Sequence, residues 1–167
     1  RYQRLASTDP LTGLHNKRWF DDILTRQIMR SSMDHKPLSL LVVDIDGLHD
    51  VNEQFGQAAG DQAVYTVAQT LTQNCRPTDL VARLGGDKFV VLLPDTDVHG
   101  AETAARHLVQ IVGRTTIVIP HECVLPPVTV SIGVGMLKAF VAADKFVADV
   151  GLALTRAQQQ GGNRAAG

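Results

Sequence analysis

Residues 83 to 89, RLGGDKF, place a carboxylate and a lysine side by side after two glycines. The glycines lie between apolar runs, a pattern typical of a tight turn between two strands. Asp87 follows this turn, where its carboxylate could bind a metal ion, and Lys88 adds a positive charge beside it. The turn could therefore belong to a catalytic site, to a disabled one, or to a hairpin without chemistry.

A second pair of carboxylates, Asp44 and Asp46, lies at the end of a nearly continuous apolar run over residues 38–45. Alternation along a strand puts both acids on one side and Ile45 on the other. Two carboxylates at a strand end can bind a hard cation such as Mg²⁺. The alternative, that they only close the strand and cap the next segment, stays open.

Length, charge and cysteine content restrict the class of protein. The 167 residues suit one domain, and 16 Lys and Arg against 17 Asp and Glu give no bulk field that favours nucleic acid. Cys75 and Cys123 lack CxxC spacing, as in reduced cytosolic proteins, and no run of 18 apolar residues occurs. We expect a cytoplasmic domain with no nucleic-acid partner and no membrane segment.

Apolar periodicity predicts an α/β sandwich, in which helices cover a mixed sheet. Helices are predicted at residues 16–33, 61–74, 99–112 and 144–160. Strands are predicted at residues 38–45, 80–84, 89–93, 115–119 and 128–136, and the end, GGNRAAG, is expected to fray. A doubly wound Rossmann fold is disfavoured, because the hairpin strands are antiparallel and no G-x-G-x-x-G follows the first strand.

The segment VVDIDGL at residues 42–48 looks like the first motif of haloacid dehalogenase-type phosphatases. In that family the first Asp is the nucleophile and the second a general acid or base, which would be Asp44 and Asp46. The family expects Thr in place of Leu48 and alternating β and α units, which this sequence does not offer. A phosphatase therefore rests on one short motif.

Four motifs in the same order resemble the GGDEF family, the diguanylate cyclases and their degenerate relatives. DPLTGLHNKRWF at 9–20 is similar to DxLTGLxNRRxF, and DIDGLHDVNEQFGQAAGD at 44–61 to DxDxFKxxNDxxGHxxGD. RPTDLVARLGGDKF at 76–89 is similar to RxxDxxxRxGGDEF, and VTVSIGVG at 128–135 to the last core strand. Each motif is weak alone, but their joint order and spacing are specific.

The resemblance implies a ferredoxin-like, nucleotidyl cyclase-like fold with a mixed central sheet of about five strands covered by helices. It implies a domain over residues 9–164, with residues 1–8 as the end of a helical stalk from an upstream sensor in a larger, membrane-bound protein. It also implies the family's reaction, in which an antiparallel homodimer joins two GTP molecules into cyclic di-GMP and pyrophosphate with two Mg²⁺ ions.

The same resemblance assigns roles to individual residues. The implied metal ligands are Asp44, the Ile45 carbonyl and Asp87, and the catalytic positions are those of Asp44, Asp87 and Lys88. The implied substrate-binding residues are Asn52, Asp61, Gly86 and His49. For Asn52 and Asp61 the alternative is helix capping, which their places before helical segments would also suit.

Several positions depart from the family pattern. The family has Glu, Lys and His where this chain has Lys88, His49 and Gln57, and it has Lys and Arg where Gln158 and Gly162 stand. Each lost charge-assisted contact to phosphate costs about 1.5 to 3 kcal/mol, so losing two or three weakens GTP binding by about a hundredfold or more.

Three interpretations of Lys88 stay open. Its side chain points away into solvent, or it pairs with Asp44 or Asp87 in place of a metal ion, or it contacts phosphate and compensates for the missing cations. The first two impair or abolish cyclisation, and only the third preserves nucleotide handling.

A spaced pair, Arg76 and Asp79, resembles the RxxD inhibitory site at which the family binds cyclic di-GMP, and Arg106 could supply a further arginine. The alternative is that Arg76 and Asp79 only shape the turn before the hairpin. The sequence predicts a GGDEF-type domain, impaired or inactive as a cyclase, that acts as a GTP- or cyclic di-GMP-binding regulatory module. The alternatives are an active diguanylate cyclase and a scaffold that binds only proteins.

Overall fold

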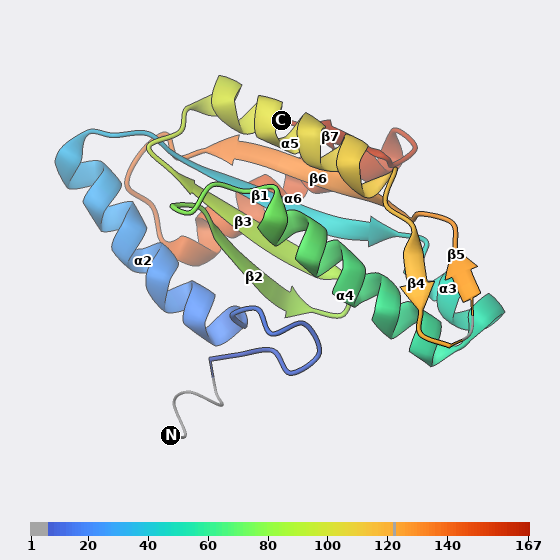
Figure 1. Cartoon of the computed structure of the whole chain (residues 1–167). Coiled ribbons are helices and arrows are strands. Elements are labelled where there is room, and N and C mark those ends of the chain that lie inside the picture. Colours follow the sequence, from blue (N-terminus) through green and yellow to red (C-terminus); the bar gives the residue numbers. More distant parts are fainter. Residues whose placement is uncertain (1–6, 122) are drawn as a thin grey trace.

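The computed structural model describes residues 7–121 and 123–167. The expected stalk at residues 1–8 falls mostly on residues 1–6, which lie outside the described part. The chain forms a five-stranded mixed sheet with helices on both faces, as predicted (Figure 1). No helix in the described part is both long and apolar enough to cross a membrane.

The central sheet has the strand order β2-β3-β1-β6-β7. These strands are β2 (Leu80–Gly85), β3 (Lys88–Pro94), β1 (Leu38–Asp46), β6 (Thr129–Met136) and β7 (Arg164–Ala166). β6 and β7 are parallel, and the other neighbours are antiparallel. β1 lies in the middle and is buried over most of its length, because its branched and leucine side chains pack on both faces.

Each face of the sheet is covered by a helix pair. On one face, α2 (Lys17–Asp34) and α6 (Ala143–Gln159) pack on Leu40 and Val42 of β1. On the other, α4 (Gln57–Gln73) and α5 (Val98–Val112) pack on Leu41, Val43 and Ile45 (Figure 1). The even-numbered residues of β1, Asp44 and Asp46 included, therefore face α2 and α6.

Helix α6 lies unusually close to β6 at Gly133. A Cβ atom there would lie 2.4 Å from both the Leu154 nitrogen and the Val150 carbonyl oxygen. No side chain larger than hydrogen fits that gap without moving the helix. Gly133 therefore fixes the distance between α6 and the sheet.

Helices α3 (Leu48–Phe55) and α4 differ from the prediction. The polar segment after β1 forms α3, which the apolar periodicity did not predict, and α4 starts four residues before Asp61. Gly56, with φ of 94°, separates the two helices. Because Asn52 and Asp61 lie inside α3 and α4, the capping alternative for both is wrong.

The predicted strand at 115–119 begins at residue 117 and lies outside the central sheet. It forms β4 (Ile117–Ile119), paired with β5 (Cys123–Leu125) in a separate hairpin. The expectation that the C-terminal GGNRAAG frays is wrong, since β7 pairs with β6 from Arg164 to Ala166. The backbone polar groups of that short strand find partners in β6 that the sequence pattern does not reveal.

Candidate functional site

The end of β1 and the turn between β2 and β3 meet at one end of the sheet. The Ile45 amide nitrogen donates a hydrogen bond of 3.0 Å to the Asp87 carbonyl oxygen, which joins the turn to β1. Gly85 and Gly86 have φ of 144° and 51°, a backbone that other residues adopt only with strain. The glycine pair therefore places Asp87 beside Asp44, as the resemblance implied.

Arg83 holds this turn to the N-terminal loop. Its Nη1 atom lies 3.1 Å and 3.2 Å from the two Asp9 carboxylate oxygens, and its Nη2 donates to the Gly86 carbonyl oxygen at 2.7 Å. Asp9 in turn accepts hydrogen bonds from the Thr12 amide and hydroxyl at 2.9 Å and 2.7 Å. Arg83 and Asp9 were not predicted to have a role, although each is a fixed letter of one of two separate motifs, and this was the signal that could have identified them.

Asp44 is half-buried and only partly satisfied. Its Oδ2 accepts a hydrogen bond of 2.8 Å from Gln158 Nε2, while Oδ1 is buried without a partner in residues 7–121 and 123–167. Burial, together with the Asp87 carboxylate, raises the pKa of Asp44 to about 7, although Lys88 and Gln158 act in the opposite direction. A positive charge placed beside Asp44 would therefore stabilise its ionised carboxylate.

The residues present suit one divalent cation. Asp44 has an unused buried oxygen, Asp87 lies next to it, and Ile45 contributes backbone at the same point. Within the described residues, no group of three or more His, Cys, Asp or Glu side chains could hold a metal. A cation here would therefore rely on two carboxylates, backbone and substrate oxygens, which is how Mg²⁺ is commonly bound.

Asp46 has a different role from Asp44. Its carboxylate accepts hydrogen bonds from Thr129 Oγ1 and Ser131 Oγ, both at 2.7 Å, and from the Asn163 backbone nitrogen at 2.9 Å. These three donors occupy Asp46 and tie β1 to β6 and to the loop before β7. For Asp46 the structure favours the simpler expectation, that it closes the strand.

Lys88 lies directly opposite Asp44 in the β1–β3 register. Its side chain is exposed, and among the described residues it makes no hydrogen bond and no ion pair within 4.0 Å. The positive charge of Lys88 lowers the pKa of Asp44, against the larger raising effects of burial and Asp87. Which of its three interpretations applies stays a prediction.

The residues implied for guanine and ribose lie on α3 and α4. The Asn52 Oδ1 atom is buried without a partner in the described part, in the space that a side chain at Gly60 would fill. Asp61 Oδ1 accepts a hydrogen bond of 2.9 Å from Gln57 Nε2. His49 is exposed, and its Nε2 lies 3.0 Å from Glu53 Oε1. Their contact with a nucleotide stays a prediction.

Arg76 and Asp79 form an ion pair with each other. Arg76 Nη2 lies 2.8 Å from Asp79 Oδ1 and donates to Thr96 Oγ1 at 2.6 Å, and the Arg76 amide donates to Asp79 Oδ2 at 2.8 Å. The Asp79 side chain is only 4% exposed. Arg106 Nη1 instead lies 3.8 Å from Glu102 Oε2. Among the described residues, Arg106 forms no hydrogen bond or ion pair with Arg76 or Asp79. The bonds between Arg76 and Asp79 stabilise the turn before the hairpin, and binding of cyclic di-GMP by the pair stays a prediction.

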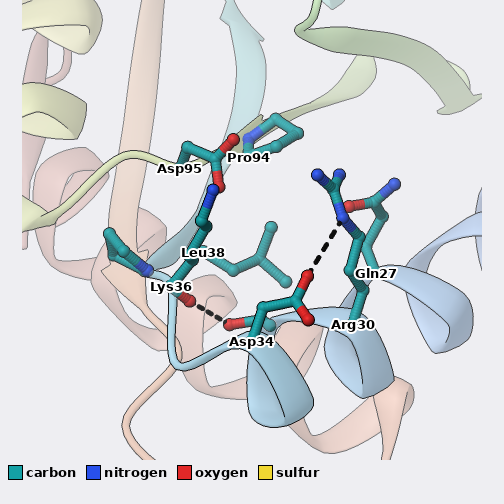
Figure 2. Close-up of a pocket in the computed structure, with 9 residues that line it drawn as sticks. Gln27, Arg30, Asp34, Lys36, Leu38, Pro94 and Asp95 are labelled. Atoms are coloured by element: carbon teal, nitrogen blue, oxygen red, sulfur yellow. Dashed lines mark hydrogen bonds and ion pairs between the residues drawn. The ribbon is translucent and has the colours of Figure 1, made fainter.

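A small pocket lies at the opposite end of β1 from Asp44. It is lined by α2 residues, Leu38, Pro94 and Asp95, and Figure 2 shows Arg30 and Asp34 beside it. Its volume of about 10 Å³ is close to the minimum for one water molecule. It is therefore too small for a nucleotide.

Known proteins resemble the chain in sequence and in structure. Residues 6–164 match the family model for the diguanylate cyclase GGDEF domain. The response regulator PleD of Caulobacter vibrioides is 38% identical over 130 residues, which cover 78% of this chain and 29% of PleD. Diguanylate cyclase DgcP of Pseudomonas aeruginosa is 34% identical over 161 residues, which cover 95% of this chain and 23% of DgcP.

A solved structure gives the same result. The GGDEF domain of DgcB from Caulobacter crescentus, crystallised in complex with c-di-GMP, matches with a TM-score of 0.91 at 27% identity. The match covers 96% of this chain and 92% of that one. The chain spans less than a third of the length of PleD and DgcP. DgcP is a relative named as a diguanylate cyclase. With its motifs, its sheet and these relatives in agreement, the chain belongs to the GGDEF domain family of cyclic di-GMP signalling.

Proposed function

We propose that this GGDEF domain is impaired or inactive as a diguanylate cyclase and acts as a nucleotide-binding regulatory module. The observation that carries the proposal is the hydrogen bond from the neutral Gln158 amide to Asp44. The family pattern has a lysine at this position, which would bring a full positive charge to the acidic pair. An amide orients the carboxylate but supplies no charge for a triphosphate.

The second missing cation supports the same proposal. Gly162 adopts a left-handed backbone with φ of 71°, and a Cβ atom there would lie 3.1 Å from Asp46 Oδ2. The family pattern has an arginine at this position. The loop before β7 is therefore built around a glycine and offers phosphate no charged group at residue 162.

Retention of the acidic pair supports binding of GTP with Mg²⁺. Asp44, Asp87 and the Ile45 backbone would hold the ion, which would neutralise phosphate charge when bound. Asn52 and Asp61 are the proposed contacts for guanine or ribose. Cyclic di-GMP is the weaker candidate ligand, because it would have to compete for Arg76 with Asp79 and Thr96.

Incubation with GTP and Mg²⁺, followed by chromatography, tests the proposed impairment. We expect no cyclic di-GMP to accumulate, while GTP raises the melting temperature as a ligand of the folded state does. Accumulation at the rate of an active GGDEF domain run in parallel would contradict impairment and favour the working cyclase. If neither GTP nor cyclic di-GMP changes the melting temperature, the scaffold interpretation replaces the nucleotide-binding one.

The proposal also covers the larger protein. The relatives PleD and DgcP are more than three times as long as their matched regions, which supports an upstream sensor domain on the same chain. We include an antiparallel homodimer and a cytoplasmic location in this proposal. Analytical ultracentrifugation with and without GTP checks the dimer.

A further inference from the structure

Lys88 is placed to act on the same point as a bound metal ion. Residues directly opposite each other in an antiparallel pair have their Cβ atoms about 4.5 to 5.5 Å apart and project from the same face. Asp44 and Lys88 are such a pair, so the lysine stem starts beside the acidic pair and on the same side of the sheet. A lysine side chain is a point charge on a flexible four-carbon stem, which lets it adjust to an entering anion.

The ammonium group of Lys88 is also uncommitted. In the described part of the chain it has no hydrogen bond and no ion pair within 4.0 Å, so its three donors are available. Within the same part of the chain, the Oδ1 atom of Asp44 is buried and accepts no hydrogen bond. This end of the sheet therefore has, among the described residues, one lysine without an ion pair within 4.0 Å and one buried carboxylate oxygen without a hydrogen bond.

A triphosphate brings about four negative charges to this acidic pair, and the charge must be compensated. Residues 158 and 162 supply none, since they are Gln and Gly. Lys88 is the cation that the sheet itself holds at this point. A divalent ion at one position and Lys88 at the other would share the compensation.

Resting on the proposed binding of GTP, we propose that Lys88 contacts the triphosphate in place of one divalent cation, so that GTP binding depends only weakly on Mg²⁺. The residue then separates two properties that a two-metal site couples, namely nucleotide binding and catalysis. Binding needs only compensating charge, which a lysine supplies. Generation of the attacking oxygen needs a Lewis acid, which a lysine does not supply.

Isothermal titration of GTP into wild type and Lys88→Met, each with excess Mg²⁺ and with EDTA, tests the inference. We expect the wild-type Kd to change by about threefold or less on removal of Mg²⁺, because the charge-assisted contact to Lys88 remains. Lys88→Met keeps the stem and removes the charge, and we expect its Kd in EDTA to rise by about tenfold or more. Melting temperatures measured without GTP check that wild type and Lys88→Met both fold.

Lys36→Met is the matched control. Lys36 is also exposed but lies just before β1, at the end of the strand far from Asp44. We expect it to bind GTP like wild type in both solutions.

Two results would overturn the inference and leave the proposed function standing: wild type that binds GTP only with Mg²⁺, or equal affinities of wild type and Lys88→Met in EDTA. Absence of GTP binding in both solutions would overturn the inference together with the nucleotide-binding part of the proposed function.

Discussion

The ion pair between Arg83 and Asp9 should contribute measurably to the free energy of unfolding, because both side chains are largely buried. Arg83→Met removes the guanidinium group, which bonds both Asp9 carboxylate oxygens and the Gly86 carbonyl, and leaves an apolar stem of similar length. The side chains of Arg83 and Asp9 are 13% and 17% exposed, so water replaces the lost partners poorly.

The expected loss follows from the number and kind of bonds. A hydrogen bond to a charged group contributes about 1.5 to 3 kcal/mol, and breaking one partner of a fully buried ion pair costs about 3 to 5 kcal/mol. For this partly buried pair we expect about 3 kcal/mol of lost unfolding free energy. In a domain of this size that corresponds to a fall of about 6 to 12 °C in melting temperature.

Urea unfolding followed by circular dichroism measures this loss. The control is Lys17→Met, which breaks an ion pair with Asp21 whose side chains are 64% and 51% exposed, and should cost at most about 1 kcal/mol. Equal losses in the two variants would show that Arg83 does not hold the turn, and the argument from burial would be wrong.

The pH dependence of the same contact has a definite sign. Burial of Asp9 opposes ionisation, but hydrogen bonds from Thr12 and Arg83 outweigh it, so the pKa of Asp9 is lowered below its ordinary value of 3.8. The stability contributed by the ionised group is thus present above pH 3.8 and lost as the pH falls through the lowered pKa. The difference in unfolding free energy between wild type and Asp9→Asn should therefore shrink on acidification below that value. A constant difference would refute the assignment.

Three further substitutions test the site. Gln158→Lys should tighten GTP binding by about tenfold, because it brings a charge to Asp44, and calorimetry showing no change would argue against charge as the missing element. Gly162→Arg should lower the unfolding free energy by about 1 to 3 kcal/mol, since its backbone is left-handed and Asp46 lies close; unchanged urea unfolding would contradict this. Arg76→Ala should cost about 1.5 to 3 kcal/mol in the same assay, because the buried Asp79 loses its charged partner, and it should weaken any binding of cyclic di-GMP; equal binding by wild type and variant, or binding by neither, would rule out the inhibitory site.

The order of strands and helices could be predicted because most elements bury one apolar face. Helices α2, α5 and α6 have this pattern, strand β1 is apolar on both faces, and the observed bounds of all four lie within one residue of those predicted. Helix α3 could not be predicted in this way, because none of its residues is fully buried. Strand β7 has only three residues, and its pairing with β6 depends on contacts distant in sequence.

The candidate site was predictable as a set of positions and not as a network. The motifs brought Asp44 and Asp87 to attention, and the fold places them together. The motifs could not show that the Asp46 carboxylate accepts hydrogen bonds from Thr129, Ser131 and the Asn163 backbone nitrogen, because those donors lie on other strands and loops. Spacing along the chain predicts which face of a strand or helix a side chain occupies, but it does not predict the side chain's hydrogen-bond partner.

The absence of a side chain at Gly133 has a consequence for engineering. Because α6 touches the backbone of β6 there, the helix has no room to move closer to the sheet, which limits how far residue 158 on α6 can shift toward Asp44. The effects of different side chains introduced at residue 158 could then be compared while the position of the helix stays the same. A panel of substitutions at that single position would vary the charge beside Asp44 while the surrounding structure stays the same.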